Sequence, residues 1–198
     1  MPRIAIVDYG AGNLVSVKKA VDFLGKDAAI TSDPALVATA DRVVLPGVGN
    51  FAATASLAGS GLRDAISDAI ARRTPFLGIC VGMQWMFEGS QESPVTRGLG
   101  LFQGECEHFP AGVKSPHVGW NQLSISAGSR LFHGIPAQSF VYFTHSFRVP
   151  VTETTVACCE YGGAFSAAVE RDHVFAVQFH PEKSGQVGLQ LLQNFCSI

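Results

Sequence analysis

The stretch Phe76-Leu77-Gly78-Ile79-Cys80-Val81-Gly82-Met83-Gln84 decides the fold that we expect for this chain. Its apolar start predicts a short buried strand at 76–79, and a helix is predicted to open over 83–88. Cys80 lies at the sharp turn between them, two residues from a glycine on either side. This pattern is typical of a nucleophile elbow, in which the glycines remove Cβ atoms that would collide. A helix N-terminus after the turn also favours a thiolate.

Strands and helices alternate around this stretch throughout the first half of the chain. Pro46 is expected to stop the third strand at once, and Asn13 is expected to cap the first helix. A repeated strand–crossover–strand order predicts parallel pairing with helices on both faces. The predicted strands are 3–7, 28–31, 42–45 and 76–79, and the predicted helices are 14–24 and 62–72.

The second half has a different texture, with apolar or alternating runs separated by Gly, Pro and Ser. These runs predict strands with hairpin-like links that extend the same sheet in part. The predicted elements are strands at 117–125, 140–149, 155–161, 165–170 and 174–179, and a final helix at 184–196. We therefore expect an α/β fold with a mixed central sheet flanked by helices, in a single domain over residues 1–198.

Composition and charge exclude several classes of protein. Charged residues make up 15% of the 198 residues and hydrophobic residues 47%, which excludes a disordered chain. No apolar run reaches the roughly 18 residues that a membrane span needs, and the start lacks a signal-peptide pattern, so we expect a cytoplasmic protein. A net charge of −2 gives no reason to expect a nucleic acid or a membrane as partner. Five cysteines without a CxxC pair predict neither a disulfide framework nor a zinc site, and no metal is expected.

A thiolate nucleophile needs a base, and His180 and Glu182 are the candidates. They follow the last predicted strand, and in an extended segment they would point to the same side, about 7 Å apart at Cα. Glu182 could then orient the imidazole and leave its other nitrogen facing Cys80. The alternative reading of the His-Pro-Glu sequence is a polar strand end that forms a turn. The remaining histidines, for which we expect a surface or structural role, are His108, His117, His133 and His173.

The loop Leu45-Pro46-Gly47-Val48-Gly49-Asn50 also follows an apolar strand. Its two glycines would let the backbone N–H of Val48 approach a ligand, as an oxyanion hole requires. The second donor would be the backbone N–H of Val81, directly after the nucleophile. Phosphate binding is the rival reading of a glycine-rich loop, but this loop lacks the Lys-Ser/Thr ending of a P-loop.

Three motifs together resemble the signatures of class I glutamine amidotransferases. They are Pro46-Gly47-Val48-Gly49, Gly78-Ile79-Cys80-Val81-Gly82-Met83-Gln84 and His180-Pro181-Glu182. Four further stretches resemble the glutaminase subunits of imidazole glycerol phosphate synthases. These are Asp8-Tyr9-Gly10-Ala11-Gly12-Asn13-Leu14, Pro116-His117-Val118-Gly119-Trp120-Asn121, Tyr142-Phe143-Thr144-His145-Ser146-Phe147 and Gln178-Phe179-His180-Pro181-Glu182-Lys183-Ser184-Gly185.

The resemblance implies a flavodoxin-like amidotransferase fold, L-glutamine as substrate and no cofactor. It makes Cys80, His180 and Glu182 the catalytic triad. Two positions depart from the family pattern. Val81 stands where Leu is frequent, and only its N–H is needed; Phe147 stands where Tyr is frequent, so a hydrogen bond assigned to that hydroxyl is lost. The residues implied to hold glutamine are Gly47, Gly49, Gln84, His145 and Ser146.

The resemblance also implies a partner, a cyclase subunit with a (β/α)8-barrel fold that receives the ammonia in a heterodimer. Asn13, Trp120 and Tyr142 are candidates for the interface or a gate, although each is equally plausible as a structural residue. Three alternatives stay open: an amidotransferase that serves another synthase, a γ-glutamyl hydrolase, and a non-catalytic module that senses glutamine. A hydrolase would be active alone, and a binding module would have no use for the base.

Overall fold

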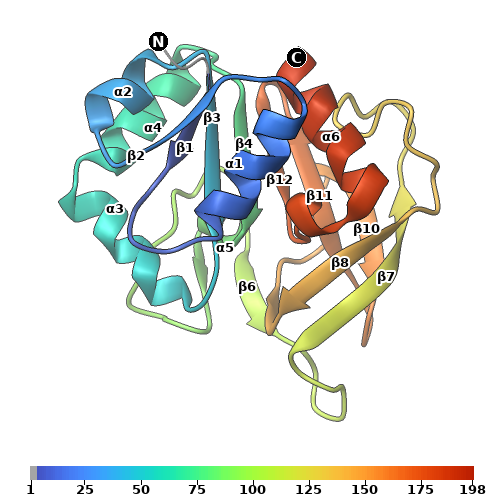
Figure 1. The fold of residues 1–198 in the computed structure, drawn as a ribbon. Coiled ribbons are helices and arrows are strands. Elements are labelled where there is room, and N and C mark those ends of the chain that lie inside the picture. The colour runs from blue at the N-terminus through green and yellow to red at the C-terminus, as the bar shows by residue number, and fades with distance from the viewer. Residues whose placement is uncertain (1–3) are drawn as a thin grey trace.

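A nine-stranded mixed sheet forms the centre of the fold in the computed structural model, which describes residues 4–198 (Figure 1). The strand order is β2-β1-β3-β4-β12-β11-β10-β7-β8, and the first five strands are parallel. The other four strands pair antiparallel, as expected for the second half. The strands are β1 Ile4–Val7, β2 Ala28–Thr31, β3 Arg42–Gly47, β4 Phe76–Cys80, β7 His117–Ile125, β8 Phe140–His145, β10 Thr155–Glu160, β11 Ala164–Arg171 and β12 Val174–Val177. Arg3, predicted to begin the first strand, lies outside the described residues.

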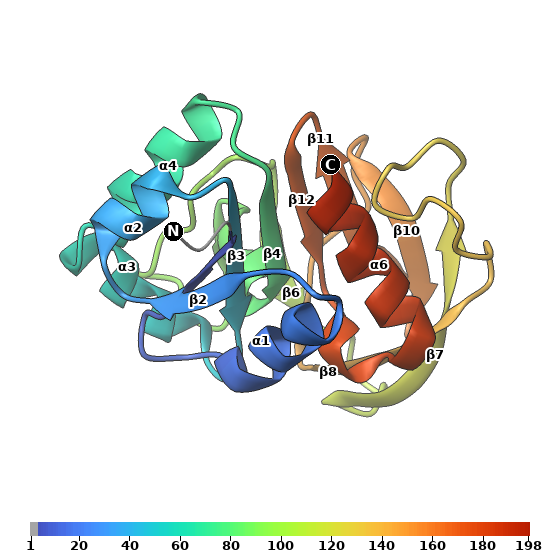
Figure 2. The same cartoon turned by 45° about the horizontal axis from the view of Figure 1, so that its top comes forward.

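Helices cover both faces of this sheet. Figures 1 and 2 show α1 and α6 together on one face, with α2, α3 and α4 on the other. The parallel strands are therefore buried from both sides, and β1, β4 and β12 contain only buried residues. The helices are α1 Leu14–Phe23, α2 Pro34–Thr39, α3 Ser56–Gly59, α4 Leu62–Ala71, α5 Val81–Trp85 and α6 Gly185–Ser197, with 3₁₀ turns η1 Phe51–Ala55 and η2 Pro181–Lys183.

The prediction that Pro46 stops the third strand is wrong, because β3 continues to Gly47. The N–H of Val43 points toward β4, where it donates to the carbonyl of Pro75. The nitrogen of Pro46 therefore points the other way, toward β1, where pairing ends at Val44. The missing N–H costs no ladder hydrogen bond at this position.

The predicted strand at 140–149 is also wrong, since it divides at Ser146 into β8 and β9 (Phe147–Arg148). Pairing of β8 with β7 ends at His145, and β9 joins a small separate sheet. That sheet also contains β5 (Gly89–Ser90) and β6 (Glu105–His108), neither of which was predicted. The helix after the elbow begins at Val81 and ends at Trp85, earlier and shorter than predicted.

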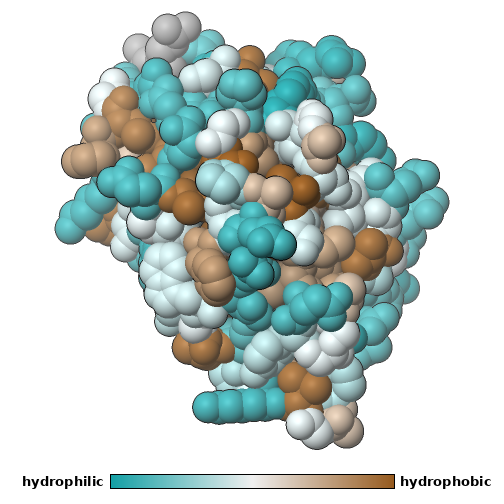
Figure 3. Space-filling view, turned by 90° about the vertical axis from the view of Figure 1, so that its right-hand side faces the viewer, coloured by the Kyte–Doolittle hydropathy of each residue, from teal (hydrophilic) through white to brown (hydrophobic). Residues whose placement is uncertain are grey.

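No helix within residues 4–198 is long and apolar enough to cross a membrane. On the face shown in Figure 3, hydrophobic residues are scattered among hydrophilic ones. Several large hydrophobic residues are nevertheless exposed within residues 4–198. Val118, Trp120 and Phe140 are three of them, and all lie on the hairpin formed by β7 and β8.

Candidate active site

Cys80 ends β4 in a backbone conformation that residues other than glycine rarely adopt, with φ 56° and ψ −111°. The chain can turn this sharply because Gly78 and Gly82 lack side chains. A Cβ on Gly78 would lie 2.7 Å from the carbonyl oxygen of Gly82, and one on Gly82 would overlap the carbonyl oxygen of Leu45. The thiol is therefore presented at the C-terminal edge of the parallel strands, at the start of α5.

His180 and Glu182 form a buried pair directly after β12. Nδ1 of His180 lies 2.9 Å from Oε1 of Glu182, and both side chains are 1% exposed. The segment is not extended as predicted, because Pro181 begins a 3₁₀ turn that brings the carboxylate back to the ring. Among residues 4–198, Nε2 of His180 has no hydrogen-bond partner, so it is the nitrogen left to exchange a proton with Cys80 or a ligand.

The charge state of His180 reflects competing effects. Burial lowers the pKa of its imidazole, but interactions with Cys80 and Glu182 raise the pKa by more, to well above the ordinary value. The ring is therefore protonated at neutral pH in the resting site. A protonated imidazole beside Cys80 stabilises a thiolate, which is the nucleophilic form of cysteine.

Asn13 does not cap α1 with its side chain, contrary to expectation. Its Nδ2 instead donates to Oε1 of Glu182 at 3.2 Å. Asn13 therefore contacts the triad from the opposite end of the chain. The first glycine-rich turn places it there, which a local sequence pattern could not reveal.

A pocket of about 240 Å³ opens above Cys80 and His180. This volume is below the roughly 300–1,000 Å³ typical of pockets for drug-sized ligands, so it suits a small metabolite. The pocket also contains Glu92, whose Oε2 accepts the backbone N–H of Phe51 at 2.7 Å and which the sequence reading missed. The lining residues are Val48, Gly49, Cys80, Val81, Gln84, Glu92, Pro116, Thr144, His145, Ser146, Phe147 and His180.

Most of the predicted glutamine-binding and oxyanion residues lie in this pocket, but Gly47 does not line it. A Cβ on Gly47 would lie 2.6 Å from the Tyr9 hydroxyl and 2.8 Å from the backbone nitrogen of Gly82. Its place in the motif is explained by close packing against the elbow. Val48 and Gly49 follow at the mouth of the pocket, and Gly49 has a φ of +85°.

Gln84 and His145 make hydrogen bonds that restrict what they can offer a ligand. Nε2 of Gln84 donates to the carbonyl of Phe147 at 3.0 Å and to Oε1 of Gln178 at 3.1 Å. Both hydrogens of the Gln84 amide are thus used, and only its oxygen remains for a ligand. His145 is hydrogen-bonded to the carbonyl of Phe147 and to His117, so it shapes the pocket wall. The ring of Phe147 packs edge-on against His108 at 5.2 Å, a contact that needs no hydroxyl.

Trp120 and Tyr142 lie outside the pocket, opposite each other on β7 and β8. Their rings meet edge-on, with ring centres 6.2 Å apart. Trp120 is 56% exposed. The carbonyl of Tyr142 accepts the backbone N–H of His180 at 3.0 Å. Tyr142 is thereby tied to the triad segment, whereas Trp120 faces solvent.

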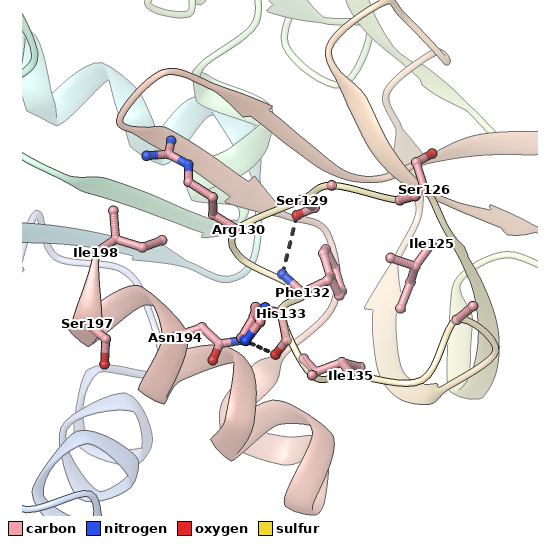
Figure 4. A pocket seen from close by; sticks show the side chains of 14 residues that line it. Ile125, Ser126, Ser129, Arg130, Phe132, His133, Ile135, Asn194, Ser197 and Ile198 are labelled. Atoms are coloured by element: carbon pink, nitrogen blue, oxygen red, sulfur yellow. Dashed lines mark hydrogen bonds between the residues drawn. The ribbon is translucent and has the colours of Figure 1, made fainter.

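A larger cavity of about 790 Å³ lies at the other end of β7, beside α6 (Figure 4). Ile125, at that end, is eight residues from His117, which corresponds to roughly 27 Å along a strand. The cavity contains no Cys and no acid–base pair, and Asn194 is engaged by the carbonyls of Leu131 and His133. Among residues 4–198, no three His, Cys, Asp or Glu side chains gather in a way that could hold a metal ion.

Comparisons with known proteins identify the family of this chain and support the fold described above. Residues 6–198 match the family model described as glutamine amidotransferase class-I. A solved structure described as a glutamine amidotransferase has a TM-score of 0.78 over 98% of this chain and 97% of that one, at 17% identity. The structure of PurLQS from Thermotoga maritima has a TM-score of 0.79 over 99% of this chain and 98% of that one, at 19% identity. The chain therefore belongs to the class I glutamine amidotransferases.

Relatives with a higher sequence identity to this chain show to which group of class I glutamine amidotransferases it belongs. Imidazole glycerol phosphate synthase subunit HisH from Moorella thermoacetica is 46% identical over 98% of this chain and 94% of its own length. The subunit HisH from Methanothermobacter thermautotrophicus is 48% identical over 98% of each chain. Within the amidotransferases, the chain thus belongs to the HisH subunits of imidazole glycerol phosphate synthase, the glutaminase subunits of histidine biosynthesis.

Proposed function

We propose that Cys80, His180 and Glu182 hydrolyse L-glutamine to glutamate and ammonia, and that the ammonia passes to a cyclase subunit. The observation that carries this proposal is the shared pocket of Cys80 and His180, with Glu182 buried behind the imidazole. The proposed product of the assembled enzyme is imidazole glycerol phosphate, together with aminoimidazole carboxamide ribotide. No cofactor enters this chemistry, and we propose that it takes place in the cytoplasm.

The first half of the reaction is acyl transfer to Cys80. The thiolate attacks the side-chain amide carbon of glutamine, and the developing oxyanion accepts hydrogen bonds from the backbone N–H groups of Val48 and Val81. One such donor typically contributes about 3–4 kcal/mol at the barrier. When the C–N bond breaks, the proton on Nε2 of His180 goes to the departing nitrogen, which leaves as ammonia.

The second half of the reaction releases glutamate. The thioester on Cys80 is attacked by a water whose proton goes to the now neutral His180, and the C–S bond breaks to regenerate the thiolate. Glu182 holds Nδ1 of the imidazole throughout and stabilises its protonated form. The protonated His180 and the thiolate then stand ready for the next glutamine.

The acceptors in the pocket support a ligand with an ammonium group. Glu92 supplies a carboxylate, and Gln84 has only its oxygen free, as argued above. Both atoms accept hydrogen bonds, so we propose that they bind the α-ammonium of glutamine. Gly49, His145 and Ser146 would then surround the rest of the amino acid.

For the partner, we propose that the (β/α)8-barrel cyclase docks over the exposed surface around Trp120 and Tyr142. This surface adjoins the turn that carries Glu182, so a partner there would lie beside the triad. Lys183 on the same turn places its ammonium 5.8 Å from the centre of the Tyr142 ring. Asn13 reaches Glu182 from the neighbouring α1 and could transmit the presence of the partner to the carboxylate.

The deciding experiment measures glutamate release from glutamine by the purified chain, alone and with the cyclase subunit and its nucleotide ligand. We expect low activity alone, strong stimulation by the liganded cyclase, and loss of activity in Cys80→Ala at unchanged cyclase affinity. High activity of the chain alone would indicate a free hydrolase. Absence of stimulation would leave an amidotransferase that serves another synthase, and binding of glutamine without turnover would indicate a sensing module.

A further inference from the structure

The sulfur of Cys80 has a hydrogen-bond donor that is not part of the triad. Nε2 of Gln178 lies 3.7 Å from Sγ of Cys80, within hydrogen-bond range for sulfur. Gln178 directly follows β12, is fully buried, and donates its backbone N–H to the carbonyl of Ala167 at 2.9 Å. Its backbone is thus held at the sheet edge while its side chain amide reaches the nucleophile.

The orientation of this amide follows from its neighbours. A main-chain carbonyl can only accept, so the atom of Gln84 that lies 3.0 Å from the carbonyl of Phe147 must be its NH₂ nitrogen. The same nitrogen lies 3.1 Å from the Gln178 amide, which must therefore present its oxygen to Gln84. The NH₂ group of Gln178 is then the end that faces Cys80, and the sulfur is the acceptor.

The carbonyl of Phe147, which fixes the orientation of Gln84, accepts a second hydrogen bond. Nδ1 of His145 lies 2.8 Å from it and must donate, so Nε2 of His145 accepts from Nδ1 of His117 at 3.2 Å. Burial lowers the pKa of both imidazoles, to about 3 for His145 and about 4 for His117, so both are neutral near pH 7. A series of hydrogen bonds thus runs from His117 to the sulfur of Cys80, through His145, the carbonyl of Phe147, Gln84 and Gln178. The direction of each bond in this series is fixed.

We propose that Gln178 is a further catalytic residue, whose side-chain N–H donates to the sulfur of Cys80 and favours the thiolate over the thiol. The proposal rests on Cys80 as the nucleophile of the proposed function. A hydrogen bond to an ionised acceptor is stronger than one to the neutral group, so this bond stabilises the charged form. With respect to Cys80, Gln84 and His145 act through Gln178 and position its amide, in addition to the contacts with glutamine proposed above.

Other titratable groups also influence Cys80, from several elements. His180 and Glu182 follow β12, Tyr9 follows β1, Cys106 lies on β6 and Glu92 lines the pocket. All of them remain in a variant changed only at Gln178. A change in the pH dependence of Cys80 reactivity in such a variant therefore reports the Gln178 hydrogen bond.

The test replaces Gln178 by Met, which has a similar length and no hydrogen-bond donor. The rate of Cys80 alkylation by iodoacetamide is measured by mass spectrometry of the Cys80 peptide, in steps of about half a pH unit from about pH 5 to about pH 10. The pH series is informative because the thiolate, and not the thiol, is the nucleophile. We expect roughly tenfold slower alkylation at neutral pH and recovery of the wild-type rate at high pH, where the thiol is ionised without help. Gln190→Met, on the exposed face of α6, is the matched control and should follow the wild-type profile.

Wild-type alkylation of Gln178→Met at every pH would overturn the proposal, as would a uniform slowing that high pH does not reverse. Because Gln178 is fully buried, Gln178→Glu provides a second variant that keeps the shape and the oxygen facing Gln84. Once this carboxyl is ionised, neither of its oxygens can donate to the sulfur, and its negative charge disfavours the thiolate. We therefore expect alkylation of Gln178→Glu to stay slow at high pH, unlike that of Gln178→Met, and a wild-type rate there would contradict the proposal.

This assay needs neither glutamine nor a partner. If Gln178→Met slows alkylation while the wild-type chain with the liganded cyclase releases no glutamate, the proposed function fails and the hydrogen bond stands. If glutamate release is normal and alkylation is unchanged, the role of Gln178 fails and the proposed function stands.

Discussion

The nucleophilic role proposed for Cys80 depends on its position in the fold, because the five free cysteines of this chain differ in their surroundings. Burial raises the pKa of the thiols of Cys106 and Cys159, which lie among apolar residues and keep their protons. Cys80 instead faces a protonated imidazole and an amide donor at the start of a helix. Its unusual φ stores roughly 1–3 kcal/mol of strain, which the surrounding sheet sustains.

The hydrogen bond from Asn13 to Glu182 leads to a prediction about turnover. Asn13→Ala removes a donor to a charged acceptor, which is typically worth about 1.5–3 kcal/mol, so we expect kcat for glutaminase activity to fall about tenfold or more. KM for glutamine should change little, because Asn13 does not line the pocket. Steady-state kinetics with the liganded cyclase would measure both.

Asn13→Asp extends this test with a side chain of nearly the same shape. It would place a second carboxylate beside Glu182, and because like charges repel we expect lower activity than for Asn13→Ala. Equal activities of the two variants would show that Asn13 does not act through the charge of Glu182.

Among the elements, the junction of β4 and α5 depends on a very close approach between backbone segments. Gly82, the second residue of α5, packs against the carbonyl of Leu45 in β3, and no side chain fits between them. The same packing brings Val48, just past β3, close to Val81 at the start of α5. The two backbone segments proposed for the oxyanion hole are therefore placed by glycine packing between neighbouring strands.

Gly82→Ala should accordingly be far more damaging than its size indicates. A Cβ there overlaps backbone and cannot be relieved by a rotamer change, so we expect at least about 3 kcal/mol of lost unfolding free energy. Gly59→Ala, in α3 with no atom within 4 Å of the new Cβ, is the matched control. It should be neutral or stabilising by up to about 1 kcal/mol. Urea unfolding of both variants measures the difference.

In the molecule as a whole, the two halves of the sheet contribute different parts of the site. The parallel half supplies the proposed nucleophile Cys80, the proposed base His180 and the glycine-rich loop at one strand edge. The antiparallel half supplies the pocket wall, including His145, and the exposed hairpin with Trp120. The site therefore forms only when both halves are assembled on β12, which joins them.

The buried histidine pair at this junction predicts sensitivity to acid. The folded-state pKa of His145 is about 3 and that of His117 about 4, both below the ordinary 6.5. The unfolded chain therefore takes up protons first as the pH falls below 6.5, and stability declines until these lower values are reached. His180, whose pKa is raised, is protonated in the folded chain throughout this range, and in the unfolded chain once the pH is well below 6.5, so it adds no slope in the lower part of the range.

His145→Gln should flatten this acid limb, even if it lowers stability at neutral pH. The urea concentration at the midpoint of unfolding would be measured from about pH 7 to about pH 4, a range chosen from these pKa values. As the pH falls, this midpoint should decline less in His145→Gln than in the wild type. His133→Gln, at an exposed position, is the control and should retain the wild-type slope. An unchanged slope in His145→Gln would contradict the account.

The exposed indole predicts the strength of partner binding. Large aromatic residues at the centre of interfaces typically cost about 2 kcal/mol or more when truncated, so Trp120→Ala should weaken cyclase binding about 30-fold or more. Leu36→Ala, at an exposed position on α2 on the other face of the sheet, should leave the Kd unchanged. Calorimetric titration of the cyclase subunit would separate them, and equal values would place the interface elsewhere.

Local pattern was enough to predict the alternating strands and helices, the elbow at Cys80 and the His180–Glu182 pair, because each depends on neighbours within a few residues. Period and flanking glycines report directly on backbone geometry over such short distances. The errors at Pro46 and Ser146 have a different origin. In both places the strand boundary is decided by which neighbouring strand is present to pair, and a single segment carries no record of its neighbour.

The contacts of Asn13, Glu92 and Gln178 with the site could come only from the tertiary structure. Asn13 and Glu182 are 169 residues apart, and Gln178 and Cys80 are 98 residues apart. Such pairs leave no periodic trace along one chain, since a polar residue at the end of a strand looks the same whether it faces solvent or a sulfur. Sequence pattern thus predicted the class and the proposed triad, whereas the sheet order decided which polar groups surround these three residues and in which direction their hydrogen bonds run.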